Sequence, residues 1–138
     1  MASANAVFET ILDSPLHRLL SGKLVMIRYQ GADPSTTEST PPLHYADTHH
    51  GIVVLADEPD GDTWWRNFTT MGQTQVLLAG EWVPMTAHAL LGSQDPDAVT
   101  PLLRSYAARF PKVVKSLDGD TLEERVERAV VVWLRPAE

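Results

Sequence analysis

Cysteine is missing from all 138 residues of the chain. Its absence excludes disulfide bonds, a thiolate nucleophile, and zinc or iron–sulfur sites built on cysteine ligands. Basic residues are also scarce, because 11 lysines and arginines stand against 18 acidic residues and give a formal net charge of −7. A protein that neutralises nucleic-acid phosphates needs clustered cations. The composition therefore argues against a nucleic acid as the partner.

Long hydrophobic runs are lacking as well. No apolar stretch reaches the ~18 residues of a membrane-spanning helix, and the first residues lack the basic and apolar segments of a secretory signal. We therefore expect a cytoplasmic protein without a membrane span. The hydrophobic fraction of 43% is ordinary for a soluble protein. The length predicts one domain over 1–138, with a helical arm at 1–22.

Common catalytic and metal-binding patterns are absent too. The chain has no GxGxxG or Walker phosphate loop and no recognisable Ser-His-Asp arrangement. His44, His49 and His50 do lie close together in the sequence, and histidine is a frequent metal ligand. However, His44 falls on an expected strand, while His49 and His50 are adjacent in an expected turn and should point apart. The acidic loop at 57–62 lacks the EF-hand pattern. We expect no metal site.

Alternating and unbroken apolar runs indicate a chain rich in β-strands. Strands are expected at 24–29, 42–46, 51–56, 74–79, 81–91 and 129–134, joined by a polar loop at 30–41 and a turn at 47–51. Short helices are expected at 15–21, 63–71, 99–110 and 111–117, and Thr121 with Glu124 forms a capping box. Adjacent strands outnumber βαβ units, which predicts a mostly antiparallel small barrel or strongly curled sheet.

Two strand features allow finer predictions. Gly80 separates two apolar runs and predicts a hairpin. Pro84 lacks a backbone N–H, so the second strand of this hairpin is expected to be an edge or to be bulged at that point.

The most unusual stretch is WWRNF at 64–68, which places two tryptophans side by side. Asp62 is a suitable N-cap for a short helix over 63–71, with Gly72 ending it. On an α-helix, residues 64 and 68 share a face, while residue 65 lies about 100° away. From these residues alone, a core position for both tryptophans is favoured.

Several short motifs occur in an order that resembles a known family. They are PLHY at 42–45, WWRN at 64–67 ahead of a hairpin, Phe110-Pro111, and VVVWLRP at 130–136. This pattern, spread over about 24–136, is similar to the deazaflavin (coenzyme F420)-dependent nitroreductase and quinone reductase family. The resemblance implies a split β-barrel of the flavin-binding type. It would have about six mostly antiparallel strands and short flanking helices.

The resemblance also implies a function. Family members bind coenzyme F420 and pass a hydride to quinones, nitro compounds or conjugated enones, while the protein binds and orients the cofactor. When the family's cofactor-binding positions are transferred to the matching residues of this chain, the resemblance implies these candidates: Ser35, Pro42, Leu43, His44, Ala56, Trp65 and Asn67. His44 takes a position often filled by tyrosine and could donate a proton. In this interpretation Trp64 faces the core, while Trp65 and Asn67 face a cleft.

The chain departs from the family where the cofactor's phosphate and acidic tail are held. The family's basic pair is matched by Asp33-Pro34, although the following hydroxyl is kept at Ser35. A lysine expected after the third strand is replaced by the acidic loop, near Asp57. Each charge-assisted contact contributes ~1.5–3 kcal/mol, and ~1.4 kcal/mol is a tenfold change in affinity. These losses would weaken cofactor binding by orders of magnitude.

Two functions of different classes therefore stand. The first is an F420- or FMN-dependent oxidoreductase that reduces a small flat acceptor. The alternative is a cofactor-free binding or accessory protein on the same fold. A hydrolase that uses a metal at His44–His50 is a distant third. Split barrels of this kind often pair, so the resemblance also leaves a homodimer open.

Overall fold

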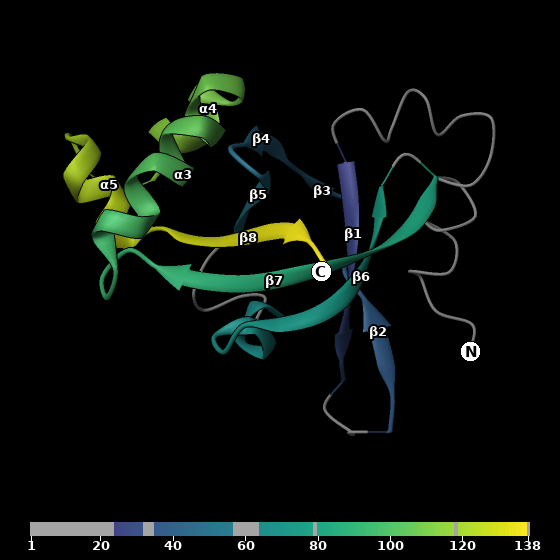
Figure 1. Cartoon of the computed structure of the whole chain (residues 1–138). Helices are drawn as coiled ribbons and strands as arrows, with labels where there is room; N and C mark the ends of the chain where they lie inside the picture. Colours follow the sequence, from purple (N-terminus) through teal and green to yellow (C-terminus); the bar gives the residue numbers. More distant parts are fainter. Residues whose placement is uncertain (1–23, 32–34, 57–63, 79, 118, 138) are drawn as a thin grey trace.

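The computed structural model describes residues 24–31, 35–56, 64–78, 80–117 and 119–137. The expected arm at 1–22, the Asp33-Pro34 pair and the acidic loop at 57–62 lie outside these residues. The structure describes strands β1 Leu24–Gln30, β2 Thr37–Ser39, β3 Leu43–His44, β4 Ala46–Thr48, β5 Gly51–Ala56, β6 Gly72–Leu78, β7 Glu81–Leu91 and β8 Val130–Pro136, with helices η1 Trp64–Phe68, α3 Pro96–Arg109, α4 Pro111–Lys115 and α5 Leu122–Arg128 (Figure 1).

The strands form one antiparallel sheet in the order β2-β1-β6-β7-β8-β5-β4. The prediction of a mainly β protein with short flanking helices is confirmed. Among the described strands, hydrogen bonds do not close the sheet into a barrel. The two ends of the sheet are nevertheless joined by one chain segment. In this segment β3 pairs with β1 near one end and β4 pairs with β5 at the other, and Tyr45 alone separates β3 from β4.

The segment after β1 has more strands than predicted. We expected a loop to residue 41 and one strand at 42–46, whereas β2, β3 and β4 all lie between Thr37 and Thr48. Pro41 and Pro42 have no N–H to donate, so they interrupt the pairing with β1. Just before them, the Thr40 hydroxyl accepts a hydrogen bond from the N–H of Ile27 at 3.0 Å. The polar composition of 30–41 concealed this strand.

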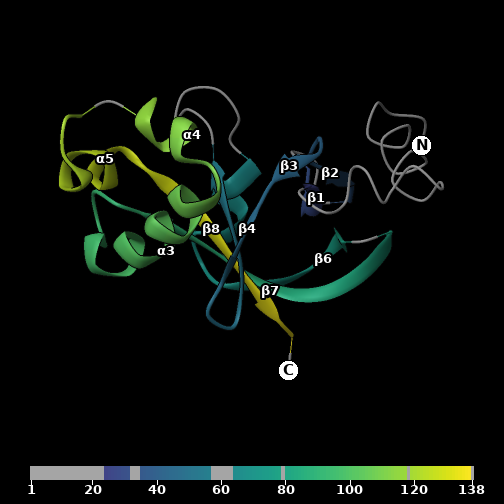
Figure 2. The ribbon, with the colours of Figure 1, turned by 90° about the horizontal axis from the view of Figure 1, so that it is seen from above.

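Among the described residues, alternation along the central strands produces two large hydrophobic cores and a small third cluster at Met26 and Leu77. On β8, Val130, Val132 and Leu134 face the core enclosed by the curled sheet, whereas Val131 and Trp133 face the helices. The same division runs along β5, which is buried on both faces as its unbroken apolar sequence predicted. Figure 2 shows α3, α4 and α5 grouped at one end of the molecule, with the curved β6–β7 hairpin extending away from them.

The β6–β7 hairpin agrees with the prediction from Gly80. Strand β7 is not the edge or bulged strand that Pro84 suggested, because it lies between β6 and β8 and pairs with β6 in an unbroken register. Gly80 adopts a φ of 82°, a conformation that glycine tolerates at no steric cost. The Pro84 carbonyl accepts from the N–H of Ala137 at 3.4 Å, just past the last residues of β7 that pair with β8. The Pro84 nitrogen points to the same side as its carbonyl, toward the end of β8. The missing N–H therefore removes no hydrogen bond between β7 and β6.

The helices begin earlier or later than the sequence suggested. Helix α3 starts at Pro96 rather than near 99, because proline suits a first helical turn. The Thr100 hydroxyl donates to the Pro96 carbonyl at 2.7 Å within that turn. At α5 the capping prediction is confirmed, since the Glu124 N–H donates to the Thr121 hydroxyl at 3.2 Å. Across the described residues, no helix is long and apolar enough to cross a bilayer.

Candidate functional site

The WWRNF segment forms a 3₁₀-helix, η1, rather than the expected α-helix over 63–71. The Asn67 side-chain amide donates to the Trp64 carbonyl at 2.8 Å, a local bond that competes with a continuing α-helix. The helix therefore stops at Phe68, and Gly72 opens β6 instead of ending a helix. The rings of Trp64 and Phe68 meet edge to face at 6.4 Å and anchor η1 in the enclosed core.

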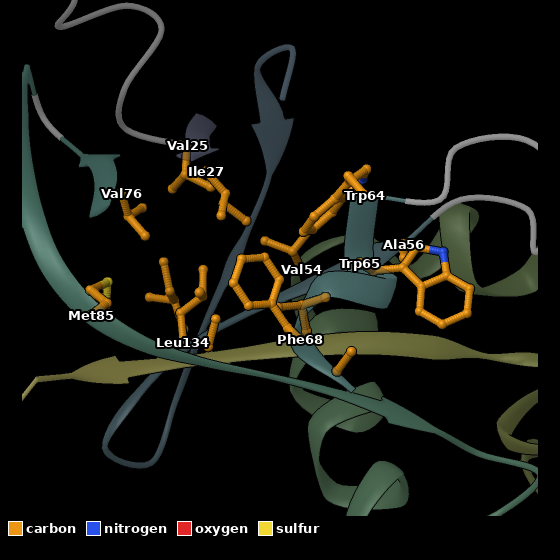
Figure 3. Packing of buried hydrophobic residues seen from close by; sticks show 14 of the residues in the cluster. Val25, Ile27, Val54, Ala56, Trp64, Trp65, Phe68, Val76, Met85 and Leu134 are labelled. Atoms are coloured by element: carbon orange, nitrogen blue, oxygen red, sulfur yellow. The ribbon is translucent and has the colours of Figure 1, made fainter. Parts of the chain in front are cut away.

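Both tryptophans are buried to the same extent, each with 4% of its surface exposed. Trp64 is a core residue as expected, and Trp65 is one as well, although it also lines a cavity as predicted. Figure 3 shows their rings leaving η1 in different directions, with the Trp65 ring on the side away from most of the labelled core residues. The indole Nε1 of Trp65 is buried and has no hydrogen-bond partner within the described part of the chain. Such an unpaired donor is costly and unusual in a folded protein.

A polar cleft of about 340 Å³ lies on one side of η1, and we name it the β1–β6 cleft. Its lining residues are Arg28, Tyr29, Gln30, Thr36, Thr37, Asn67, Phe68, Gly72, Gln73 and Thr74. Asn67 therefore faces a cleft as predicted, and the candidate Ser35 precedes Thr36 in the chain. Gly31 allows Thr36 to approach the backbone closely, because a Cβ at position 31 would lie 2.4 Å from the Thr36 hydroxyl oxygen.

Arg28 supplies positive charge to the β1–β6 cleft. Its guanidinium lies 3.9 Å from the centre of the Trp82 ring and donates to the Gln75 side-chain oxygen at 3.4 Å. Of the described residues that line the cleft, it is the one cation. The sequence carried a signal for it, since Arg28 is the charged member of the otherwise apolar run LVMIRY. What the sequence could not show is that β2 and η1 lie beside it.

A second cavity, of about 560 Å³, lies on the other side of η1 along β7. Pairing between β6 and β7 ends at Gly72 and Ala87. Among the described residues, the last part of β7, from His88 to Leu91, therefore has no strand neighbour on this edge. Trp65 and Arg66 form one wall, with the guanidinium 5.4 Å from the indole ring. His88 and Asp95 also line this cavity.

His44, the predicted proton donor, lies apart from both cavities. Its exposed ring contacts Phe110 at the junction of α3 and α4, with ring centres 5.1 Å apart. The neighbouring Leu43 packs instead against the enclosed core, as alternation along a strand requires. Arg109 fixes the junction by donating to the Tyr45 carbonyl at 3.2 Å. His44 does not share a described cavity with Trp65 or Asn67.

The structure thus divides the predicted site residues into groups. Leu43 packs against the enclosed core that contains Ala56 and Trp65, and Pro42 is half-buried next to Leu43 in the chain. Asn67 lies at the β1–β6 cleft, with the exposed Ser35 next to Thr36 in the chain.

The two turn histidines also differ from expectation. His49 and His50 were predicted to point apart, yet their ring centres are 3.8 Å apart. The reason is the tight two-residue turn between Thr48 and Gly51, in which His50 adopts a φ of 69°. Among the described residues, no three histidine, aspartate or glutamate side chains are arranged to hold a metal ion.

No protein-family model matches the chain, and no curated protein matches it either. The structure itself defines a mainly antiparallel β protein with a polar, arginine-containing cleft beside a tryptophan-rich 3₁₀-helix.

Proposed function

We propose that the protein is a deazaflavin- or flavin-dependent oxidoreductase that reduces a small flat acceptor such as a nitro compound, quinone or enone. The observation that carries the proposal is the donor set of the β1–β6 cleft. Arg28 offers a guanidinium, Thr36 a hydroxyl and Asn67 an amide within one cavity. These are the groups that bind phosphate and polyhydroxyl tails. Asn67 is also one of the cofactor-binding residues that the family resemblance implies.

Size and burial favour the same proposal. The cleft volume of about 340 Å³ falls within the range of ~300–1,000 Å³ typical of ligand sites. On the other side of η1, the unpaired Nε1 of Trp65 lies in the core that also contains Ala56. A buried donor without an acceptor suits a site where a ligand carbonyl or ring nitrogen completes the hydrogen bonding.

The cofactor would supply the hydride, and this chain's residues would bind and orient it. Arg28 would pair with the phosphate, while Thr36 and Asn67 would fix the tail through hydrogen bonds. The Arg28 guanidinium is held in place by Trp82, which lowers the entropy lost on binding. His44 as proton donor remains a prediction, since its ring contacts Phe110 and lines neither cavity beside η1. The proposal includes a cytoplasmic location and leaves a homodimer open.

A cofactor-free binding protein is the second candidate, and a specific observation favours it. The described lining of the β1–β6 cleft contains a single cation, in a chain of net charge −7. One charge-assisted contact contributes ~1.5–3 kcal/mol, much less than a set of several cations would. A neutral polar ligand would then suit the cleft better than a phosphorylated one.

Direct titration tests the first candidate. The purified chain is titrated with coenzyme F420 and separately with FMN, following cofactor fluorescence. We expect saturable binding of at least one of them. Failure of both to bind at tens of micromolar would refute the oxidoreductase proposal and favour the binding protein.

Two variants test the assignment of the cleft. Arg28→Met keeps the stem over Trp82 but removes the charge, and Asn67→Ala removes the amide. Each should weaken cofactor binding about 10–100-fold, equivalent to ~1.5–3 kcal/mol. Arg66→Met is the matched control, because Arg66 lies on η1 but lines the other cavity. If Arg66→Met weakens binding as much as Arg28→Met, the cleft is not the phosphate site.

A further inference from the structure

A mostly apolar cavity of about 360 Å³ lies between the β4–β5 turn and α3, and we name it the α3 chamber. It is lined by Thr48, His49, His50, Leu90, Ala98, Pro101, Leu102, Ser105 and Trp133. None of the described residues that line the β1–β6 cleft takes part in it. Its walls are aliphatic on the α3 side and aromatic on the sheet side, which suits a flat apolar body.

A polar cavity of about 600 Å³ adjoins the α3 chamber. The two share His50 and Trp133, and the polar one adds Met71, Gln73, Thr86, Arg135 and Pro136. Gln73, Thr86 and Arg135 form a row across β6, β7 and β8, because Gln73 pairs with Thr86 and Thr86 with Arg135. We call this second cavity the Arg135 cleft.

Arg135 is a cation without a carboxylate partner among the described residues. Its guanidinium lies 4.5 Å from the centre of the Trp133 ring and donates to the Met71 sulfur at 3.1 Å, a weak acceptor. Its Nε is buried with no hydrogen bond in the described part of the chain. A guanidinium that is stacked but not neutralised is prepared to bind an anion bidentately.

The boundary between the two cavities is held firmly. The Trp133 indole N–H donates to the Thr48 hydroxyl at 3.1 Å, which ties β8 to the β4–β5 turn. In that turn the His49 and His50 rings lie against each other, and His50 has a positive φ that costs a non-glycine residue energy. Strain of this kind is retained where surrounding structure imposes it, often beside a ligand.

We propose that the α3 chamber and the Arg135 cleft together bind a small flat aromatic carboxylate. The ring system enters the α3 chamber beside Trp133 and Leu102, and the carboxylate reaches toward Arg135. The imidazoles of His49 and His50 line the passage and offer N–H donors. The inference needs no redox cofactor. Of the described residues that line the two cavities, only Gln73 also lines the β1–β6 cleft, and neither Arg28 nor Asn67 takes part, so the inference stands apart from the proposed function.

The charge requirement is tested with two probes of equal shape. The full chain, without added cofactor, is titrated with 2-naphthoate and with the neutral 2-naphthamide by calorimetry. We expect one saturable site for 2-naphthoate and at least tenfold weaker binding of 2-naphthamide. Equal binding of the two probes, or no saturable binding of 2-naphthoate up to millimolar concentration, overturns the proposal.

Variants locate the anion site. Arg135→Met should weaken 2-naphthoate binding to the level of 2-naphthamide, whereas Arg135→Lys should retain part of the difference. Arg66→Met is the matched control, since Arg66 also stacks on a tryptophan but does not line either cavity. Thermal melts confirm that each variant is folded. If folded Arg135→Met binds 2-naphthoate as tightly as the original chain, the carboxylate does not use Arg135 and the proposal fails.

A second experiment tests whether the ring system binds in the α3 chamber by filling that chamber. Ala98→Phe adds an aromatic ring to the chamber wall and should reduce binding of both probes at least tenfold. Ala108→Phe adds the same ring to an exposed position of α3 outside the described lining and should leave binding unchanged. Equal effects of the two variants would show that the ring system binds elsewhere.

Discussion

Replacing Thr40 with valine should expose the energetic role of one buried hydroxyl. Thr40 has 1% of its surface exposed, and its side chain accepts from the N–H of Ile27 at 3.0 Å. Ile27 is fully buried, so its N–H cannot turn to water when the acceptor is removed. Valine has nearly the same shape as threonine, which confines the change to the lost hydrogen bond. The backbone bond from Thr40 N to the Ile27 carbonyl, at 2.9 Å, can stay.

The expected cost follows from leaving a buried donor unpaired. That penalty is ~1–3 kcal/mol in folded proteins. With an unfolding entropy of about 2.1 cal/mol/K per residue, 138 residues give about 290 cal/mol/K. Each 1 kcal/mol then lowers the melting temperature by about 3–4 °C. Thr40→Val should therefore melt ~3–10 °C below the original chain.

The assay is calorimetric melting combined with amide hydrogen exchange. Thr37→Val is the matched control, because Thr37 lies on the same segment but is exposed. The Ile27 amide should exchange faster in Thr40→Val and at its normal rate in Thr37→Val. If Thr40→Val melts within 1 °C of the original chain and protects the Ile27 amide equally, the hydroxyl does not hold β1 to the segment that follows β2.

Two further variants probe packing. Gly92→Ala would place a Cβ 1.6 Å from the Val126 carbonyl oxygen, so α5 must shift and stability should fall by at least ~1–3 kcal/mol in a denaturant titration. Gly72→Ala meets nothing closer than 3.9 Å and should change stability little, so equal losses would refute the contact. Thr48→Val removes the acceptor of the Trp133 indole and should cost ~0.5–1.5 kcal/mol. The indole N–H resonance of Trp133 should shift, and an unmoved resonance would contradict the bond.

The regular parts of the sheet were predictable because local sequence alone determines them. Strands β5 and β7 have the predicted bounds, since each apolar run is flanked by turn residues. The irregular parts depend on single interactions that periodicity does not report. Thr40 and the Pro41-Pro42 pair divide one segment into short strands, and the Asn67 side chain makes η1 a 3₁₀-helix.

The candidate site was predictable only in part, for a similar reason. The family resemblance implied that Asn67 faces a cleft, and Asn67 lines one. Arg28 joins it from β1 through pairing between segments far apart in the sequence, which no local pattern encodes. Trp65 was expected to face a cleft and not the core. A large ring can bury nearly all its surface and still leave one edge in a cavity wall.

The central place of β8 has a consequence for how the protein is made. Strand β8 lies between β7 and β5, although it follows every other strand in the sequence. While the ribosome is still adding residues before Val130, the apolar strand β5 has no partner along one edge. The nascent chain must therefore keep Ile52–Ala56 from pairing with other chains until β8 emerges. The strand order thus leaves one edge of the apolar strand β5 unpaired until β8 has been made.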